Sequence, residues 1–156
     1  MGLLLLEGAI KAIDSYLEAN IATYLNTLDS EYADFVLDDI KTWYLGNIPS
    51  GIPEYPSVCF QGVSEEPGVH VKSRIYPKMY VNVIVFVGDN DDQLRFKKLC
   101  RYIRAITSLL FNGEASHGYK ITIEAPAVPS DTLGTTPFIQ AMTLPISLYP
   151  PDGEAY

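Results

Sequence analysis

The sequence has few of the residues that usually carry catalysis or metal binding. Its 156 residues include only two histidines and two cysteines. Cys59 and Cys100 do not form a CxxC pair, and His70 and His117 fall in expected loops. A disulfide framework is therefore excluded, and a zinc site would need further ligands such as Glu65, Glu66 and Glu114 to gather by chance. We expect neither metal nor cofactor, and we interpret both cysteines as buried thiols.

The common catalytic motifs are also missing. The chain has no hydrolase elbow, phosphate loop, dinucleotide fingerprint or zincin motif. A Cys100 to His117 nucleophile pair would place its thiol on a helix stripe that we expect to pack on a sheet, where it would be inert. The neighbouring acids Asp91 and Asp92 are interpreted as charges that favour the start of a helix. The sequence predicts no catalytic residue and does not indicate an enzyme.

Basic residues and long apolar runs are scarce. Eleven lysines and arginines stand against nineteen acids, which gives a net charge of −8 and a pI near 4.6. Strong binding to nucleic acid phosphates needs clustered basic residues, so that function class is excluded. A duplex that slides past an acidic wall is still compatible with this charge. No segment reaches the length of a membrane span, so we expect no membrane partner.

The abundant residues are apolar. They make up 47% of the chain, and the mean hydropathy of +0.08 is high for a soluble monomer. We therefore expect apolar surface to be buried between subunits. The length predicts a single domain over residues 1–156, with a mobile tail at about 150–156.

The stretch from residue 80 to residue 113 organises the chain. Residues 80–87 are almost all β-branched or aromatic, which predicts a central strand covered on both faces. Asn90 and Gln93 have the spacing of a capping box, and Asn112-Gly113 supplies a stop signal for the helix between them. The apolar stripe expected to face the sheet is Phe96, Leu99, Cys100, Ile103, Ile106 and Leu110.

The remaining periodicity completes an α+β fold. Apolar residues spaced from Leu6 to Leu28 predict a long amphipathic N-terminal helix, and the acidic stretch 29–39 is interpreted as a short solvated helix. Strands are expected over residues 55–63, 74–87, 119–124 and 138–149, with bulges or sheet edges at Pro77 and Pro145. Residues 64–73 are interpreted as an exposed excursion. These elements predict a mostly antiparallel sheet of four to five strands, covered by the N-terminal and central helices.

Charge is unevenly distributed along the chain. One face of the central helix carries Lys97, Lys98, Arg101 and Arg104, while the stretch 29–39 carries five acids and no base. One interpretation is a solvated helix surface. The other is a head-to-tail interface in which this basic face meets Asp34, Asp38 and Asp39 of the next subunit. Under the second interpretation, reversing Lys98 and Arg101 to Glu should weaken assembly and leave the fold intact.

The order of elements resembles the tail terminator, or tail completion, proteins of tailed bacteriophages. The resemblance covers roughly residues 3–149. It includes the long N-terminal helix, a strand opening with Tyr55-Pro56-Ser57-Val58, the apolar strand 80–87, an acidic turn, a central helix and late strands. It rests on this pattern of elements and on no invariant motif.

The resemblance implies a structural ring protein of the virion, assembled in the host cytoplasm. The ring, expected to be a hexamer of identical subunits, would terminate the tail tube and join it to the neck, and DNA would pass through its lumen without specific binding. Exposed residues that would contact the tube, the sheath or the connector are Glu65, Glu66, His70 and Lys72. Two alternatives stay open: another head-tail joining protein, such as a stopper or adaptor-associated completion protein, and a small α/β ligand-binding module or enzyme.

Overall fold

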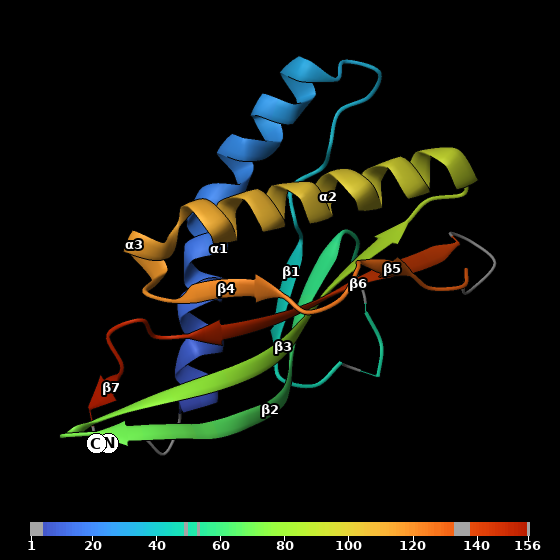
Figure 1. Ribbon diagram of the computed structural model, residues 1–156. Helices are drawn as coiled ribbons and strands as arrows, with labels where there is room; N and C mark the ends of the chain where they lie inside the picture. The colour runs from blue at the N-terminus through green and yellow to red at the C-terminus, as the bar shows by residue number, and fades with distance from the viewer. Residues whose placement is uncertain (1–4, 49, 53, 133–137, 156) are drawn as a thin grey trace.

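Two long helices lie on one face of a twisted sheet (Figure 1). The computed structural model describes residues 5–48, 50–52, 54–132 and 138–155. The helices are α1 (Leu5–Glu31) and α2 (Asp92–Asn112), and a single turn, α3 (Glu114–His117), follows α2. This arrangement agrees with the predicted α+β class and with the predicted cover of two helices.

The sheet contains more strands than the sequence predicted. Its strands are β1 (Thr42–Leu45), β2 (Ser57–Val71), β3 (Arg74–Gly88), β4 (Lys120–Ile123), β5 (Val128–Pro129), β6 (Ile139–Tyr149) and β7 (Glu154–Ala155). The order is β1-β2-β3-β6-β4, with β5 on β6 and β7 on β3, and only the β1–β2 pair is parallel. The prediction missed β1, β5 and β7, because strands of two to four residues are too short to show alternation.

The strand β3 is the centre of the sheet, as its composition predicts. It pairs with β2 on one side and with β6 on the other. Its side chains at alternate positions from Met79 to Val87 are buried against α1 and α2 in the main core. On the opposite face only Ile84 is buried, while Tyr80, Asn82 and Phe86 are half-buried. The expected cover on both faces is therefore present only near the middle of the strand.

The helix α1 follows its predicted pattern closely. The residues Ile10, Ile13, Leu17, Ile21 and Leu28 are all buried in the core, as their spacing requires. Because α1 crosses α2 and also contacts β2 and β3, one apolar stripe covers both a neighbouring helix and the sheet. The stripe thereby fixes the position of α1 over the β1 side of the sheet.

The helix α2 differs from its prediction in two respects. Asp91 is the N-cap, with Oδ1 accepting a hydrogen bond from Leu94 N at 2.9 Å, whereas Asn90 accepts one from Phe138 N. The buried face is also rotated: Phe96 and Cys100 are exposed, and Arg95 and Tyr102 are buried in their place. The expected burial of Cys100 was wrong because the stripe is set by packing against both α1 and the sheet, and not by the sheet alone.

The acidic stretch after α1 is not a helix. Residues 32–41 run as turn and extended backbone into β1. Asp29 Oδ1 accepts a hydrogen bond from Leu37 N at 2.9 Å, and Leu37 is buried in the core. An aspartate that bonds a backbone amide further along the chain favours a loop over a continued helix. This bond holds the loop against the helices, so the short-helix interpretation was wrong.

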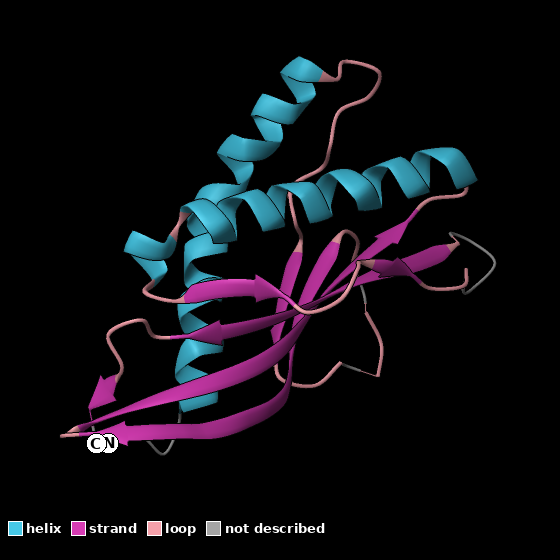
Figure 2. Ribbon diagram, in the orientation of Figure 1, coloured by secondary structure: helices cyan, strands magenta, loops and turns pink. Residues whose placement is uncertain are grey.

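The predicted excursion at residues 64–73 is a long hairpin (Figure 2). Here β2 and β3 continue past the helices, and Val71 pairs with Arg74 across a two-residue turn. A register shift in β2 lies opposite Pro77, as a bulge at that proline predicts, and Gly68 in this shift has φ +75. The C-terminal strand β7 pairs with Arg74 and Ile75, so the tail has a packing partner that the sequence did not suggest. We call residues 65–78 the β2–β3 arm.

Candidate interaction surfaces

Most of the predicted basic face is paired within its own chain. Lys97 Nζ lies 3.5 Å and Arg101 Nη2 lies 2.7 Å from the Asp34 carboxylate, and Lys98 Nζ lies 3.0 Å from Asp89. The hydrogen bond from Arg101 is the main cause that lowers the pKa of Asp34. Three of the four basic residues predicted at the interface therefore bind carboxylates of their own chain. Two of them stabilise the loop after α1, and the third stabilises the turn after β3. Reversing Lys98 and Arg101 would also break these contacts within the chain, so an effect of that variant on assembly would have to be separated from an effect on stability.

Arg104 and two of the predicted interface acids, Asp38 and Asp39, make no ion pair within the described part of the chain. Arg104 is exposed and hydrogen-bonds two tyrosines, Tyr32 Oη at 3.4 Å and Tyr24. The side chains of Asp38 and Asp39 are also exposed. Asp38 is held through its carbonyl oxygen, which accepts a hydrogen bond from Tyr102 Oη at 2.6 Å. These charges stay available to a partner.

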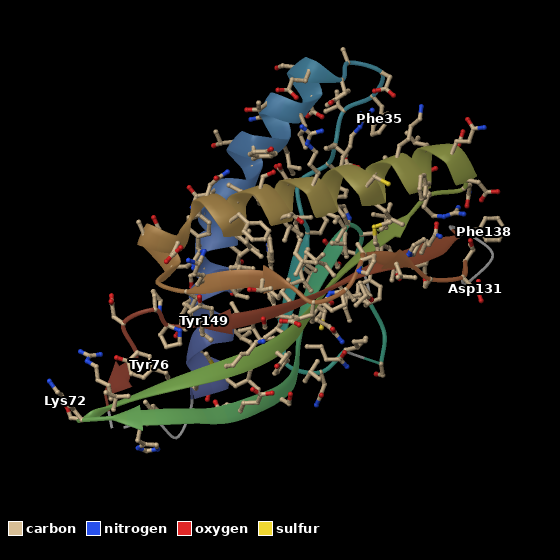
Figure 3. All side chains as sticks on the ribbon, in the orientation of Figure 1. Phe35, Lys72, Tyr76, Asp131, Phe138 and Tyr149 are labelled. Carbon is tan, nitrogen blue, oxygen red and sulfur yellow. The ribbon has the colours of Figure 1, made fainter. Side chains whose placement is uncertain are left out.

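The residues predicted to contact the tube or neck lie together on the β2–β3 arm. Glu65, Glu66, His70 and Lys72 are all exposed. Figure 3 shows Lys72 at the tip of the arm and Tyr76 further back, close to β7. Tyr80 Oη donates a hydrogen bond to Glu66 Oε1 at 3.0 Å, which ties the two strands together at the base of the arm. The arm is a hydrogen-bonded pair of strands. It therefore holds its exposed side chains at more fixed positions, farther from the helices, than an irregular loop would.

The described residues contain no catalytic constellation. His117 is buried: Nε2 lies 2.8 Å from Leu110 O, Nδ1 accepts a bond from Tyr119 N, and its ring meets Tyr16 edge-on. Cys100 is exposed, but partial desolvation raises the pKa of its thiol, which disfavours a nucleophile. No group of three metal-ligating side chains occurs within residues 5–48, 50–52, 54–132 and 138–155. Over the same residues, no helix is long and apolar enough to cross a membrane.

A shallow depression of about 350 Å³ lies on the face of the sheet opposite the helices, and Glu66, Tyr80 and Glu124 are among the residues that line it. Its polar groups bind one another. Ser147 Oγ donates to Glu124, Lys78 Nζ lies 3.4 Å from Glu124, and these contacts, the Ser147 bond first, lower the pKa of that carboxyl. Glu66, Tyr80, Asn82 and Glu124 thus bind partners within the chain, so these side chains do not converge on the depression as the polar groups of a ligand site would.

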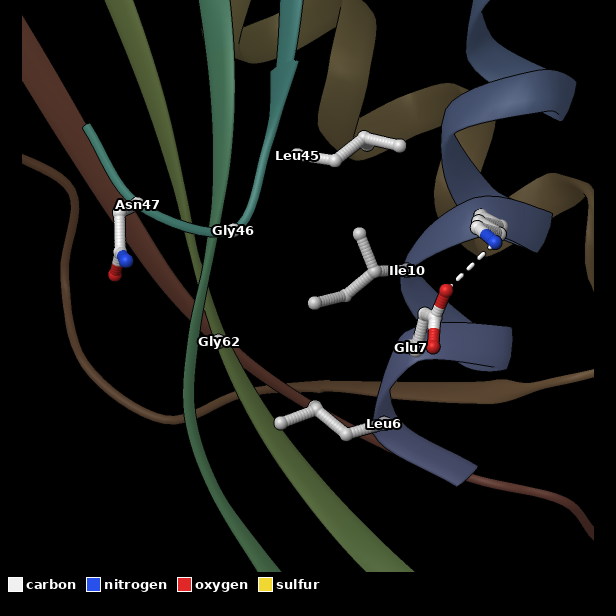
Figure 4. Close-up of a pocket in the computed structure, with 8 residues that line it drawn as sticks. Leu6, Glu7, Ile10, Leu45, Gly46, Asn47 and Gly62 are labelled. Carbon is white, nitrogen blue, oxygen red and sulfur yellow. Dashed lines mark ion pairs between the residues drawn. The ribbon is translucent and has the colours of Figure 1, made fainter. Parts of the chain in front are cut away.

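The edge of the sheet formed by β1 carries exposed apolar and acidic side chains. We call this surface the β1 edge; it comprises Leu45 and Ile48 at one end of the strand and Asp38, Asp39 and Glu54 near the other. Next to it lies a depression of about 330 Å³ between β1, β2 and the start of α1. Figure 4 shows Leu6, Ile10 and Leu45 around this space, with the Glu7–Lys11 ion pair at its rim. The β1 edge is a candidate contact surface with a net negative charge.

The opposite side of the sheet has an apolar groove of about 510 Å³ between α2 and β5. We call it the α2–β5 groove; Phe96, Cys100, Ile103, Ala127, Pro129 and Met142 line it, with Arg104 at its rim. Phe96 is 49% exposed. Exposed Phe111 and Ile123 extend this apolar surface along α2 and β4. Large exposed apolar side chains gathered in one place are typical of a contact site.

Sequence reasoning found the charges of these surfaces but missed their apolar parts. Leu45 lies in a strand, β1, that was not predicted, and Phe96 was assigned to the stripe expected to face the sheet. The sequence did contain a sign of this exposed apolar surface. In α2, Phe96 and Phe111 lie outside the stripe formed by Leu99, Ile106 and Leu110, so apolar side chains occur on more than one face of the helix. A helix apolar beyond one stripe indicates a second packing partner.

No protein-family model matches this chain, and no curated protein matches its sequence.

Proposed function

We propose that the protein is a structural ring subunit of a tailed bacteriophage, which terminates the tail tube and joins it to the neck. The single observation that supports this most strongly is the presence of two unlike open edges on one sheet. The β1 edge is apolar and acidic, and the α2–β5 groove is apolar with a basic rim. Surfaces that differ in this way favour head-to-tail contacts, and repeated head-to-tail contacts close into rings.

The β2–β3 arm supports the joining role. It extends the sheet beyond the two helices, and its exposed side chains include the four residues predicted to contact other tail or neck components. In this proposal the two open edges make the ring, while the arm reaches a different protein, such as the tube protein or the connector. The acidic net charge of −8 suits a lumen through which DNA slides without binding.

The order of elements gives further support. The resemblance to tail terminator proteins rests on a long first helix, a long central strand and a following helix, and all three occur in the fold.

The proposal is tested by assembly. Multi-angle light scattering after size exclusion should give a closed oligomer, alone or with the tube protein of the same phage. Electron micrographs should show that oligomer as a cap at one end of the tubes. A protein that stays monomeric at high concentration and leaves tube ends bare contradicts the proposal.

A further inference from the structure

We infer that residues 150–155, which we call the strap, hold the β2–β3 arm in the conformation that its joining partner binds. The inference rests on the proposed joining function of the arm and adds the element that positions it. The sequence predicted a mobile tail in this region, whereas the structure pairs the strap with the arm.

The arm needs support because β6 does not follow it to its tip. The pairing of β6 with β3 ends at Met79, and on that side of β3 the strand β7 reaches only Arg74 and Ile75. No described strand pairs with residues 76–78 on that side, and Pro77, which has no N–H, lies in this gap. A ribbon of two strands is marginally stable by itself in water. Without a third strand, the arm would therefore bend and twist over a range of conformations.

The strap supplies this third strand. After β6 the chain turns, with Gly153 N donating a hydrogen bond to Pro150 O at 3.1 Å. It then enters β7, which pairs antiparallel with Arg74 and Ile75 of the arm (Figure 1). The strap thereby spans the gap beyond the end of β6 and joins the arm to the rest of the sheet.

Two residues fix the strap on the arm. Arg74 Nη1 donates hydrogen bonds to Gly153 O at 3.0 Å and to Asp152 O at 3.3 Å. Gly153 is buried with φ +74, and a Cβ there would lie 2.9 Å from Ile75 O and 3.0 Å from the Tyr76 ring. Glycine suits both this backbone conformation and this close approach. The strap therefore fits closely against the arm.

The strap is connected directly to the residues predicted to contact the tube or neck. Ile75 pairs with β7 on one side and with His70 on the other, and Lys72 lies in the turn at the tip. Fixing the strap therefore fixes the direction of these side chains. A partner that binds an arm already held in one conformation loses less conformational entropy, so it binds more tightly. By linkage, a bound partner should in turn stabilise the strap.

Hydrogen exchange tests the strap without any partner. Gly153→Ala crowds the arm, and the matched control is Gly118→Ala, at φ +84, where the new Cβ would meet no described atom within 4 Å. Both variants place alanine at positive φ, but only the first acts on the strap. Amides of residues 70–76 should exchange about tenfold faster in Gly153→Ala than in Gly118→Ala, while amides of residues 81–87 should exchange at equal rates in the two.

A reversible cross-link tests partner binding. Arg74→Cys with Ala155→Cys, in a Cys100→Ser background, removes the guanidinium and places thiols at paired positions. Residues directly opposite each other in an antiparallel pair lie about 4.5–5.5 Å apart at Cα, which a disulfide can span. The reduced protein should bind the tail tube protein or the connector about tenfold more weakly than the wild type, and oxidation should restore the affinity. Arg74→Cys in the same background is the control, and oxidation should leave its binding weak.

The outcomes separate the strap from the function. Faster arm exchange in Gly153→Ala, together with binding that recovers on oxidation, supports the inference. If the wild type binds tubes or connector, but the reduced and oxidised proteins bind equally or the two alanine variants exchange alike in the arm, the inference is overturned and the proposed function stands. A wild type that binds neither tubes nor connector overturns both.

Discussion

Arg101, in the middle of α2, donates a hydrogen bond from Nη2 to Asp34 Oδ1 at 2.7 Å, across 67 positions of the sequence. Its guanidinium also lies 4.0 Å from the centre of the Phe35 ring. The basic helix face and the acidic stretch therefore meet inside one subunit. The charge pattern that suggests an interface serves partly to fix the loop that leads into the β1 edge.

Arg101→Ala should lower the free energy of unfolding by about 1 kcal/mol, because it removes an exposed ion pair and a cation–π contact. Urea unfolding followed by circular dichroism measures this change. In a double-mutant cycle with Asp34→Ala, the coupling energy should be small and favourable and should decrease in high salt. If Arg101→Ala lowers the unfolding free energy by the same amount in Asp34→Ala as in the wild type, a direct interaction between Arg101 and Asp34 is contradicted.

Arg95 should be the most costly basic residue to remove. Its side chain is 3% exposed and donates hydrogen bonds to Asp89 O at 2.7 Å, Thr132 Oγ1 at 3.1 Å and Gln140 Oε1 at 3.3 Å. Arg95→Met leaves these acceptors without a donor, so we expect a loss of about 2–3 kcal/mol in unfolding free energy. Lys97→Met, whose side chain is 54% exposed in the wild type, is the matched control and should change stability by less than about 0.5 kcal/mol. Equal losses in the two variants would show that Arg95 has no special structural role.

Asp14 should make stability depend on pH. It is 8% exposed, Oδ1 has no hydrogen-bond partner, and burial, followed by the interaction with Glu18, raises the pKa of the carboxyl from 3.8 to about 7. A carboxyl whose pKa is raised by folding holds its proton longer in the folded state. The contribution of Asp14 to the free energy of unfolding is therefore most favourable below pH 3.8, and it is lost as the pH rises to about 7.

Asp14→Asn removes the buried charge and should raise the unfolding free energy at pH 8 by about 1–3 kcal/mol, with little effect at pH 4. Chemical denaturation at a series of pH values measures both. Glu18→Gln is the control. Between pH 4 and pH 7 it should reduce the change of the unfolding free energy with pH without removing it, because Asp14 remains buried. A wild-type slope that Asp14→Asn leaves unchanged would contradict this assignment.

Shortening the arm should separate joining from ring formation. Replacing residues 67–77 by an Asn-Gly turn keeps the Glu66–Lys78 strand pair and removes the part of the hairpin that is mostly exposed. We expect the shortened protein to self-associate like the wild type but to lose binding to tail tubes or to the connector. Light scattering and tube pull-down measure the two properties. Val71→Ser with Tyr76→Ser, which keeps the length of the arm and removes two exposed apolar side chains, should weaken tube binding to a lesser degree.

The sequence by itself determined the helices α1 and α2, the central place of β3 and the α+β class. These features follow from local periodicity, since a repeat of two or of three to four residues fixes which side chains share a face. It also determined that few residues suited to catalysis are present. The length of α1 and the burial of its stripe are direct results of this pattern.

Only the tertiary structure decided the rotation of α2, the ion pairs of its basic face and the shape of residues 64–73. Cys100 is exposed and Arg95 is buried because α2 packs against α1 as well as the sheet, and the spacing of apolar residues along one helix does not indicate two packing partners. Lys97 and Arg101 found Asp34 because the loop after α1 folds back over α2. Such pairings depend on distance in space between segments far apart in the chain, and that distance is set by the packing of the whole core.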